Sequence, residues 1–155
     1  MSGVDGVHEG MPVRGILAHV KHVQEGRARA YSRWDAEFVQ WRTGRTDDRA
    51  YAAACEDARR DIQQASTSMI KLATWLSTTP DGESWGRLIT QLQRCEKRKF
   101  ELTVERIMLR AQAGNDLEVR DAELLCRECV VRRGLADVID EINDILEQIE
   151  FEIHA

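Results

Sequence analysis

The hydrophobic positions of this chain recur with a seven-residue period over most of its length. The clearest run steps alternately by four and three residues, through Tyr51, Cys55, Ala58, Ile62, Ala65, Met69, Leu72 and Leu76. This spacing places every member on one side of an α-helix, where it can pack against other helices. The pattern predicts a long helix from Thr46, its expected N-cap, to the turn sequence at 77–84.

Similar patterns predict helices on both sides of this one. The first is expected to begin at Pro12 and to end at Gly44. Its apolar seam is interrupted by one charge and runs through Val13, Ile16, Val20, Val23, Arg27, Ala30, Trp34, Phe38 and Trp41. A third helix should end at Gly114, and Asn115 should cap a fourth with Ala122, Leu125 and Cys129 on its apolar face.

The short connections predict antiparallel neighbours, and helices of about 30 residues predict lengths of roughly 45 Å. We therefore expect an all-α fold, an elongated antiparallel helical bundle or coiled coil of four to five helices. The number depends on Gly134, where a helix either ends or continues in phase with the apolar positions after it. The expected organisation is a tail at 1–11, a bundle at 12–133 and an acidic helix at 134–155 that continues the preceding one.

Composition agrees with one charge-rich helical domain. The chain has 155 residues, of which 43% are hydrophobic and 32% charged, and its net charge is −5. This balance argues against general affinity for nucleic acid. No apolar run approaches the roughly 20 residues of a membrane span, and the first residues lack the apolar core of a signal peptide. We expect an intracellular protein, cytoplasmic or nuclear.

The last 22 residues contain seven acidic residues and no Lys or Arg. They also contain an apolar stripe, made of Ile139, Ile142, Ile145, Leu146, Ile149 and Ile153. Two interpretations remain open. The stripe either closes the bundle or docks on another protein, such as a helical partner or a basic surface.

Arginine outnumbers lysine by 18 to 4. One cluster, at Arg42, Arg45 and Arg49, surrounds the first expected turn beside Trp41, and a second lies at 94–99. Arginine beside aromatic residues can bind phosphate and stack on bases, which makes direct nucleic-acid binding a third candidate. Acidic residues alternate with both clusters, which is more typical of a solvated helix face.

The sequence offers little other chemistry. Cys126 and Cys129 form the one CxxC pair, and a zinc site needs further ligands. His19 and His22, spaced i, i+3, could face the two cysteines across a bundle. We favour burial of these cysteines as small apolar residues, with no metal and no cofactor. No catalytic triad, carboxylate pair or phosphate-binding loop has supporting context, so we do not expect an enzyme.

Several helical motifs resemble those of the "Required for excision 1-B" domain family over roughly residues 14–110. The first expected helix contains Gln24, Arg27 and Tyr31 in the spacing Q-x-x-R-x-x-x-Y. The third matches the family's I-x-x-L-Q-x-x-E-x-x-K pattern through Ile89, Leu92, Gln93, Glu96 and Lys99, followed by Phe100, Leu102 and Thr103. The resemblance implies an association with DNA excision repair through protein contacts, without an active site.

The expected function is thus that of a non-enzymatic helical adaptor linked to DNA repair, with other proteins, helical in structure, as partners. The expected partner-binding residues are Ile139, Ile142, Leu146, Ile149 and Ile153 in the acidic helix, with Arg42, Arg45 and Arg49 at the first turn. The alternative is a structural coiled-coil subunit of a large cytoskeletal or ciliary (axonemal) assembly. Long helices without an active site suit either function.

Overall fold

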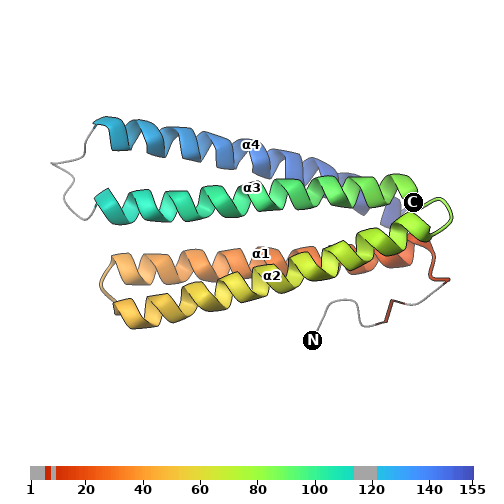
Figure 1. Cartoon of the computed structure of the whole chain (residues 1–155), viewed down its shortest axis with the longest axis horizontal. Helices are drawn as coiled ribbons and strands as arrows, with labels where there is room; N and C mark the ends of the chain where they lie inside the picture. Colours follow the sequence, from red (N-terminus) through yellow and green to blue (C-terminus); the bar gives the residue numbers. More distant parts are fainter. Residues whose placement is uncertain (1–5, 8–9, 114–121) are drawn as a thin grey trace. The chain divides into compact units, whose positions relative to one another are not determined.

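A computed structural model of the chain describes residues 6–7, 10–113 and 122–155. These residues form four α-helices and no strand: α1 (Val13–Arg42), α2 (Asp48–Thr78), α3 (Glu83–Ala113) and α4 (Ala122–Ile153) (Figure 1). The expected all-helical fold is therefore confirmed. The expected cap at Asn115 lies outside the described residues.

The chain divides into two compact units. The first contains Met1–Thr90 and Ile149–Ala155, and the second contains Gln91–Gln148. The expected domain boundary at residue 133 falls inside α4. The sequence left open whether a helix ends at Gly134, and in the structure α4 continues through it.

In the first unit, α1 and α2 lie side by side as a hairpin (Figure 1). Near the turn, the rings of Trp41 and Tyr51 stack. Further from it, Arg33 on α1 pairs with Asp61 on α2 at 3.1 Å. Since residues earlier in α1 meet residues later in α2, the two helices are antiparallel.

Backbone groups at both helix ends make hydrogen bonds within the hairpin turn. Gly44 has φ 74°, in the left-handed region that favours glycine, and its N–H donates to the Trp41 carbonyl. Asp47 is the N-cap of α2, and its side chain accepts a hydrogen bond of 2.8 Å from Ala50 N. The prediction of Thr46 as the cap was wrong by one residue, because Asp47 is the extended residue whose carboxylate reaches the exposed amide.

The apolar seams correspond to the buried faces of the first two helices. In α2 every member of the seven-residue run is buried except Cys55, which is half-buried. The α1 seam is buried from Ile16 to Phe38, and it includes Arg27 with 1% of its surface exposed. The sequence pattern missed two further buried residues of α1, Leu17 and Gln24.

The second unit pairs the later part of α3 with most of α4. The Cys95 thiol donates to Glu141 at 3.3 Å, and Arg110 lies 3.7 Å from Glu128, so these helices are also antiparallel. A small core joins them and consists of Leu109, Val131 and Leu135, with Leu102 and Leu124 packed against it.

One prediction about α4 was wrong. Ala122, Leu125 and Cys129 are exposed, whereas Leu124 and Val131 face the core. The cause is that the buried face of α4 has a different helical phase from the predicted one. Going back from Leu135, the core positions are Val131 and Leu124, so that Leu124 faces the core in place of the predicted Leu125. Beyond Gly134, Ile142, Ile145 and Ile149 of the expected apolar stripe are buried, together with Val138, whereas Ile139 is exposed.

Candidate functional site: a basic groove between α1 and α2

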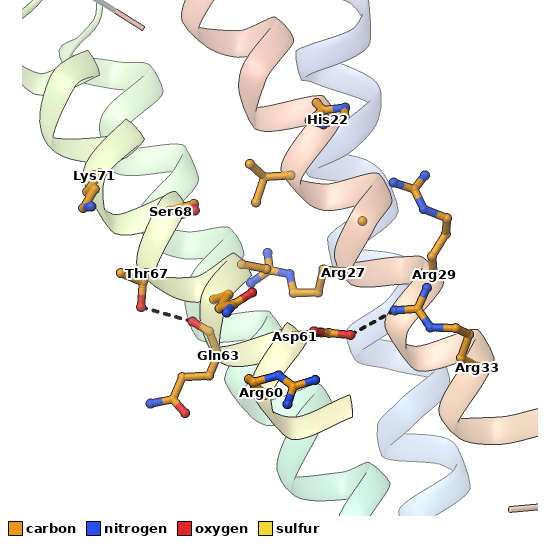
Figure 2. Close-up of a pocket in the computed structure, with 14 residues that line it drawn as sticks. His22, Arg27, Arg29, Arg33, Arg60, Asp61, Gln63, Thr67, Ser68 and Lys71 are labelled. Carbon is orange, nitrogen blue, oxygen red and sulfur yellow. Dashed lines mark hydrogen bonds and ion pairs between the residues drawn. The ribbon is translucent and has the colours of Figure 1, made fainter. Parts of the chain in front are cut away.

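A groove of about 570 Å³ lies between α1 and α2 in the first unit. Figure 2 shows that side chains from both helices form it, with Arg29 and Arg33 on α1 and Arg60 and Lys71 on α2. The groove is lined by His22, Val23, Gly26, Arg27, Arg29, Arg33, Arg60, Asp61, Gln63, Gln64, Ala65, Thr67, Ser68 and Lys71. All of these residues belong to the described part of the first unit.

The lining is strongly cationic. It contains four arginines and one lysine against one acidic residue, Asp61. Asp61 pairs with Arg33, and Arg60 pairs at 3.0 Å with Asp57, which lies outside the lining. These side chains are between 36% and 64% exposed, and ion pairs with such exposure contribute only about 0–1 kcal/mol. They can therefore be exchanged for contacts with an anionic ligand at small cost.

The base of the groove is polar and fixed. Arg27 is buried, and its Nε and Nη2 atoms donate to Gln24 Oε1 at 3.2 and 2.6 Å. Gln24 and Ser68 are buried as well, with 6% and 4% of their surfaces exposed. This hydrogen bonding holds the Arg27 guanidinium in one orientation, so the charge at the base is preorganised.

The remaining lining residues are small or hydrogen-bonding. The groove lining has two purely aliphatic side chains, those of Val23 and Ala65, and both are buried. Gly26 has no side chain. Gln63, Gln64 and Thr67 are exposed on α2, and the Thr67 hydroxyl donates to the Gln63 backbone carbonyl at 3.1 Å (Figure 2). Apart from those of Val23 and Ala65, every side chain of the lining carries a charged or hydrogen-bonding group.

Residues 15–110, more than half of the chain, match the sequence model of the DNA repair REX1-B family. The chain belongs to this family. The matched region contains nearly all of α1, all of α2 and most of α3, so the basic groove lies entirely within it. A search of curated proteins and a search of solved structures found no match to the chain.

The predicted arginine cluster lies within the REX1-B region but outside the groove. Arg42 is half-buried at the end of α1, Arg45 lies in the turn, and Arg49 is exposed in the first turn of α2. The neighbouring Trp41 stacks on Tyr51, and its Nε1 donates to Asp48 Oδ1 at 2.8 Å. Trp41 therefore has a packing function here, as the sequence favoured.

The predicted partner-binding residues of α4 lie outside the REX1-B region and differ in exposure. Ile142 and Ile149 are buried, Leu146 and Ile153 are half-buried, and Ile139 is 39% exposed. Five of the seven acidic residues are exposed, namely Asp137, Asp140, Glu141, Asp144 and Glu147. The buried isoleucines thus contribute to the protein interior, and partner binding by this helix remains a prediction.

The CxxC pair is exposed, so the expected burial of Cys126 and Cys129 was wrong. Their face of α4 is separated from the face that carries Val131 and Leu135. Across the described residues, His, Cys, Asp and Glu form no cluster of three or more that could hold a metal ion. None of the described helices is long and apolar enough to cross a membrane.

The groove was not predicted from the sequence, although part of its signal is present there. Arg29 and Arg33 are four residues apart on α1, and Arg60 and Lys71 are eleven apart on α2, so each pair lies on one helix face. The arginines that lie close together in the sequence, at residues 42–49, predicted a different site instead. Only the register of α1 against α2 shows that the two separate pairs line one groove.

Proposed function

We propose that this protein is a non-enzymatic helical adaptor that acts in DNA excision repair through contacts with other proteins. The observation that carries the proposal is membership of the DNA repair REX1-B family over residues 15–110. The motifs in α1 and α3 that resemble the "Required for excision 1-B" domain lie within the same residues.

The proposal of an adaptor rather than an enzyme is supported by the chemistry of the chain. Five of the residues that line the groove are cationic, which is an arrangement suited to binding an anionic ligand. The exposed acidic residues in the later part of α4 provide a second charged surface of opposite sign. We propose that this acidic surface, with the partly exposed Ile139, docks on a basic surface of a protein partner.

The repair function is tested by survival after ultraviolet irradiation. A strain that lacks the gene should be more sensitive than its parent, and the wild-type chain should restore survival. Equal survival of the two strains would reject the proposal. Sedimentation of the protein with microtubules or axonemes from a native lysate, combined with normal ultraviolet survival, would instead support the cytoskeletal or ciliary alternative.

Docking by α4 needs a separate test that leaves the core intact. Deleting the helix would remove buried residues such as Ile142, so substitution of exposed acids is the better choice. Asp137→Asn, Asp140→Asn and Asp144→Asn together should reduce recovery of partners in a pull-down analysed by mass spectrometry. The matched control neutralises three exposed acids elsewhere, Asp35, Asp81 and Glu101. Equal recovery with both triple variants would contradict docking through the acidic surface.

A further inference from the structure

The groove between α1 and α2 concentrates positive charge in a chain whose net charge is −5. Two of its cations, Arg29 and Lys71, make no ion pair with another described residue, and Arg33 and Arg60 make only exposed ones. Because the chain as a whole repels polyanions, general ionic attraction does not favour their binding. An anion that binds would have to use this local excess of charge.

The donors in the groove suit phosphate groups. A guanidinium presents several N–H donors in a planar fork, which matches the oxygens of a phosphate. Arg29 and Arg33 come from one wall, Arg60 and Lys71 from the other, and the buried Arg27 lies between them (Figure 2). Cationic donors from both helices thus line the groove. Gln63, Gln64 and Thr67 add neutral groups for sugar or phosphate oxygens.

The same lining disfavours a protein helix as the ligand. Protein interfaces usually have an apolar centre into which large side chains insert. In this groove the aliphatic side chains, Val23 and Ala65, are small and already buried. An amphipathic helix would therefore gain little by laying its apolar face there.

The cations of α2 continue beyond the groove in one direction. Arg49, Arg60 and Lys71 follow one another at intervals of eleven residues, which is close to three helical turns, and all three are exposed. They form a row on one face of α2, about 16 Å apart and roughly 33 Å in total. A row of this length suits a ligand with repeated charges better than a single phosphate group.

We propose that the α1–α2 groove binds the sugar-phosphate backbone of a single nucleic-acid strand without reading its bases. The cations of the groove and of the α2 row are the charges that such a strand would contact. The lining contains no Phe, Tyr or Trp on which bases could stack, so affinity is expected to come mainly from phosphate contacts and to be independent of sequence. Arg49 of the row also belongs to the arginine cluster predicted at residues 42–49, and that cluster itself does not line the groove.

The test is fluorescence anisotropy of the full chain with a labelled oligothymidine, which forms no duplex. Affinity should fall between about 50 and 200 mM salt, with a slope of log K against log salt near −3 if four cations each contact a phosphate. The double variant Arg29→Gln, Lys71→Gln should weaken binding by about tenfold and reduce the slope by roughly 1.4.

Two neighbouring arginines provide a matched control. Arg59 and Arg60 are both exposed on α2, and each forms an ion pair with the acid three residues before it. Arg60 lines the groove, whereas Arg59 does not. Arg60→Gln should therefore weaken oligothymidine binding, and Arg59→Gln should leave it unchanged. Circular dichroism verifies that the variants retain their helices.

Three results would overturn the proposal: no binding of oligothymidine at the lowest salt, equal losses with Arg59→Gln and Arg60→Gln, or tighter binding of a duplex than of the single strand. Competition by polyglutamate as effective as by unlabelled oligothymidine would also reject it, in favour of an acidic protein ligand. The measurement uses purified protein and is independent of the adaptor proposal. Normal ultraviolet survival and failure of strand binding are therefore distinguishable outcomes.

Discussion

Trp41 and Tyr51 stack across the first hairpin turn, with ring centroids 4.7 Å apart and an interplanar angle of 8°. Phe38 contacts both rings, at centroid distances of 5.9 and 6.0 Å. This aromatic cluster joins the last turns of α1 to the first turn of α2. It therefore helps to fix the register that brings the groove cations together.

Replacing Trp41 by Ala should destabilise the protein by about 2–3 kcal/mol. The change removes the stack, worth about 0.5–1.5 kcal/mol, together with apolar burial and the hydrogen bond to Asp48. Val39, in the same helical turn, is 47% exposed, and Val39→Ala should change stability by less than about 0.5 kcal/mol. Urea unfolding of both variants measures the difference, and equal midpoints would contradict a packing function for Trp41.

Two helical glycines should respond in opposite directions to alanine. A Cβ at Gly26 would have Arg29 Nη2 as its nearest neighbour at 3.7 Å, so Gly26→Ala should stabilise α1 by up to about 1 kcal/mol. At Gly86 a Cβ would lie 2.6 Å from Ser77 Oγ and 3.1 Å from the backbone oxygen of Ala73. Gly86→Ala should therefore lower the stability of the protein, because the added methyl group would clash where α3 approaches α2 closely. Thermal melts with shifts of the same sign would refute this account.

The four thiols should react at different rates. Burial, followed by the hydrogen bond to Glu141, raises the pKa of Cys95 to about 11 from its usual 9.0, which lowers the thiolate fraction at neutral pH about a hundredfold. Cys126 and Cys129 are exposed and should be alkylated by iodoacetamide much earlier, as mass spectrometry can show. In denaturant all four should react alike. Native labelling of Cys95 as fast as that of Cys129 would be inconsistent with its environment.

The raised pKa of Cys95 also has a consequence for stability. An acidic group whose pKa is higher in the folded state contributes stability that is complete below the unfolded pKa, near 9.0, and lost as pH rises through about 11. Cys95→Ser should reduce the loss of stability across this range, because serine does not titrate there. An identical alkaline profile in wild type and variant would exclude Cys95 as its source.

Lys21 and Glu150 link α1 to the end of α4 within the first unit through an ion pair of 2.9 Å. The hydrogen bond from Lys21, with a further one from His154, lowers the pKa of Glu150 below its usual 4.5. A lowered carboxyl pKa gives stability that is present above 4.5 and lost as pH falls through the folded value. In Lys21→Gln the Glu150 pKa should rise, whereas Lys71→Gln should not change it. Carbon NMR titration of the Glu150 carboxyl decides between these results.

The hydrophobic pattern was sufficient to predict most of the helical faces. The positions Ile62, Met69 and Leu92 are buried because a stripe of large apolar side chains must leave water whatever its partner. The pattern failed in the early part of α4, where Leu124 and Leu125 are adjacent and only packing decides which one faces inward. The N-cap of α2 was also mispredicted, because the side chains of both Thr46 and Asp47 are of types that can cap a helix.

The candidate site was less accessible to sequence reasoning. The charges of Arg29 and Lys71 are separated by more than forty residues, and nothing local indicates that they line one groove. Arg27 occupies a seam position that would normally be apolar, and its burial depends on hydrogen bonds with Gln24, one turn earlier. Such compensation is a tertiary property. The family, in contrast, could be predicted from the sequence because the resemblance depends on local motifs within α1 and α3.

A function in excision repair, proposed for this member of the DNA repair REX1-B family, is best tested by ultraviolet survival of a null strain. The null strain should be more sensitive than its parent, and the wild-type chain should restore survival. Survival of the null strain equal to that of its parent, across the full dose range, would refute a function in excision repair.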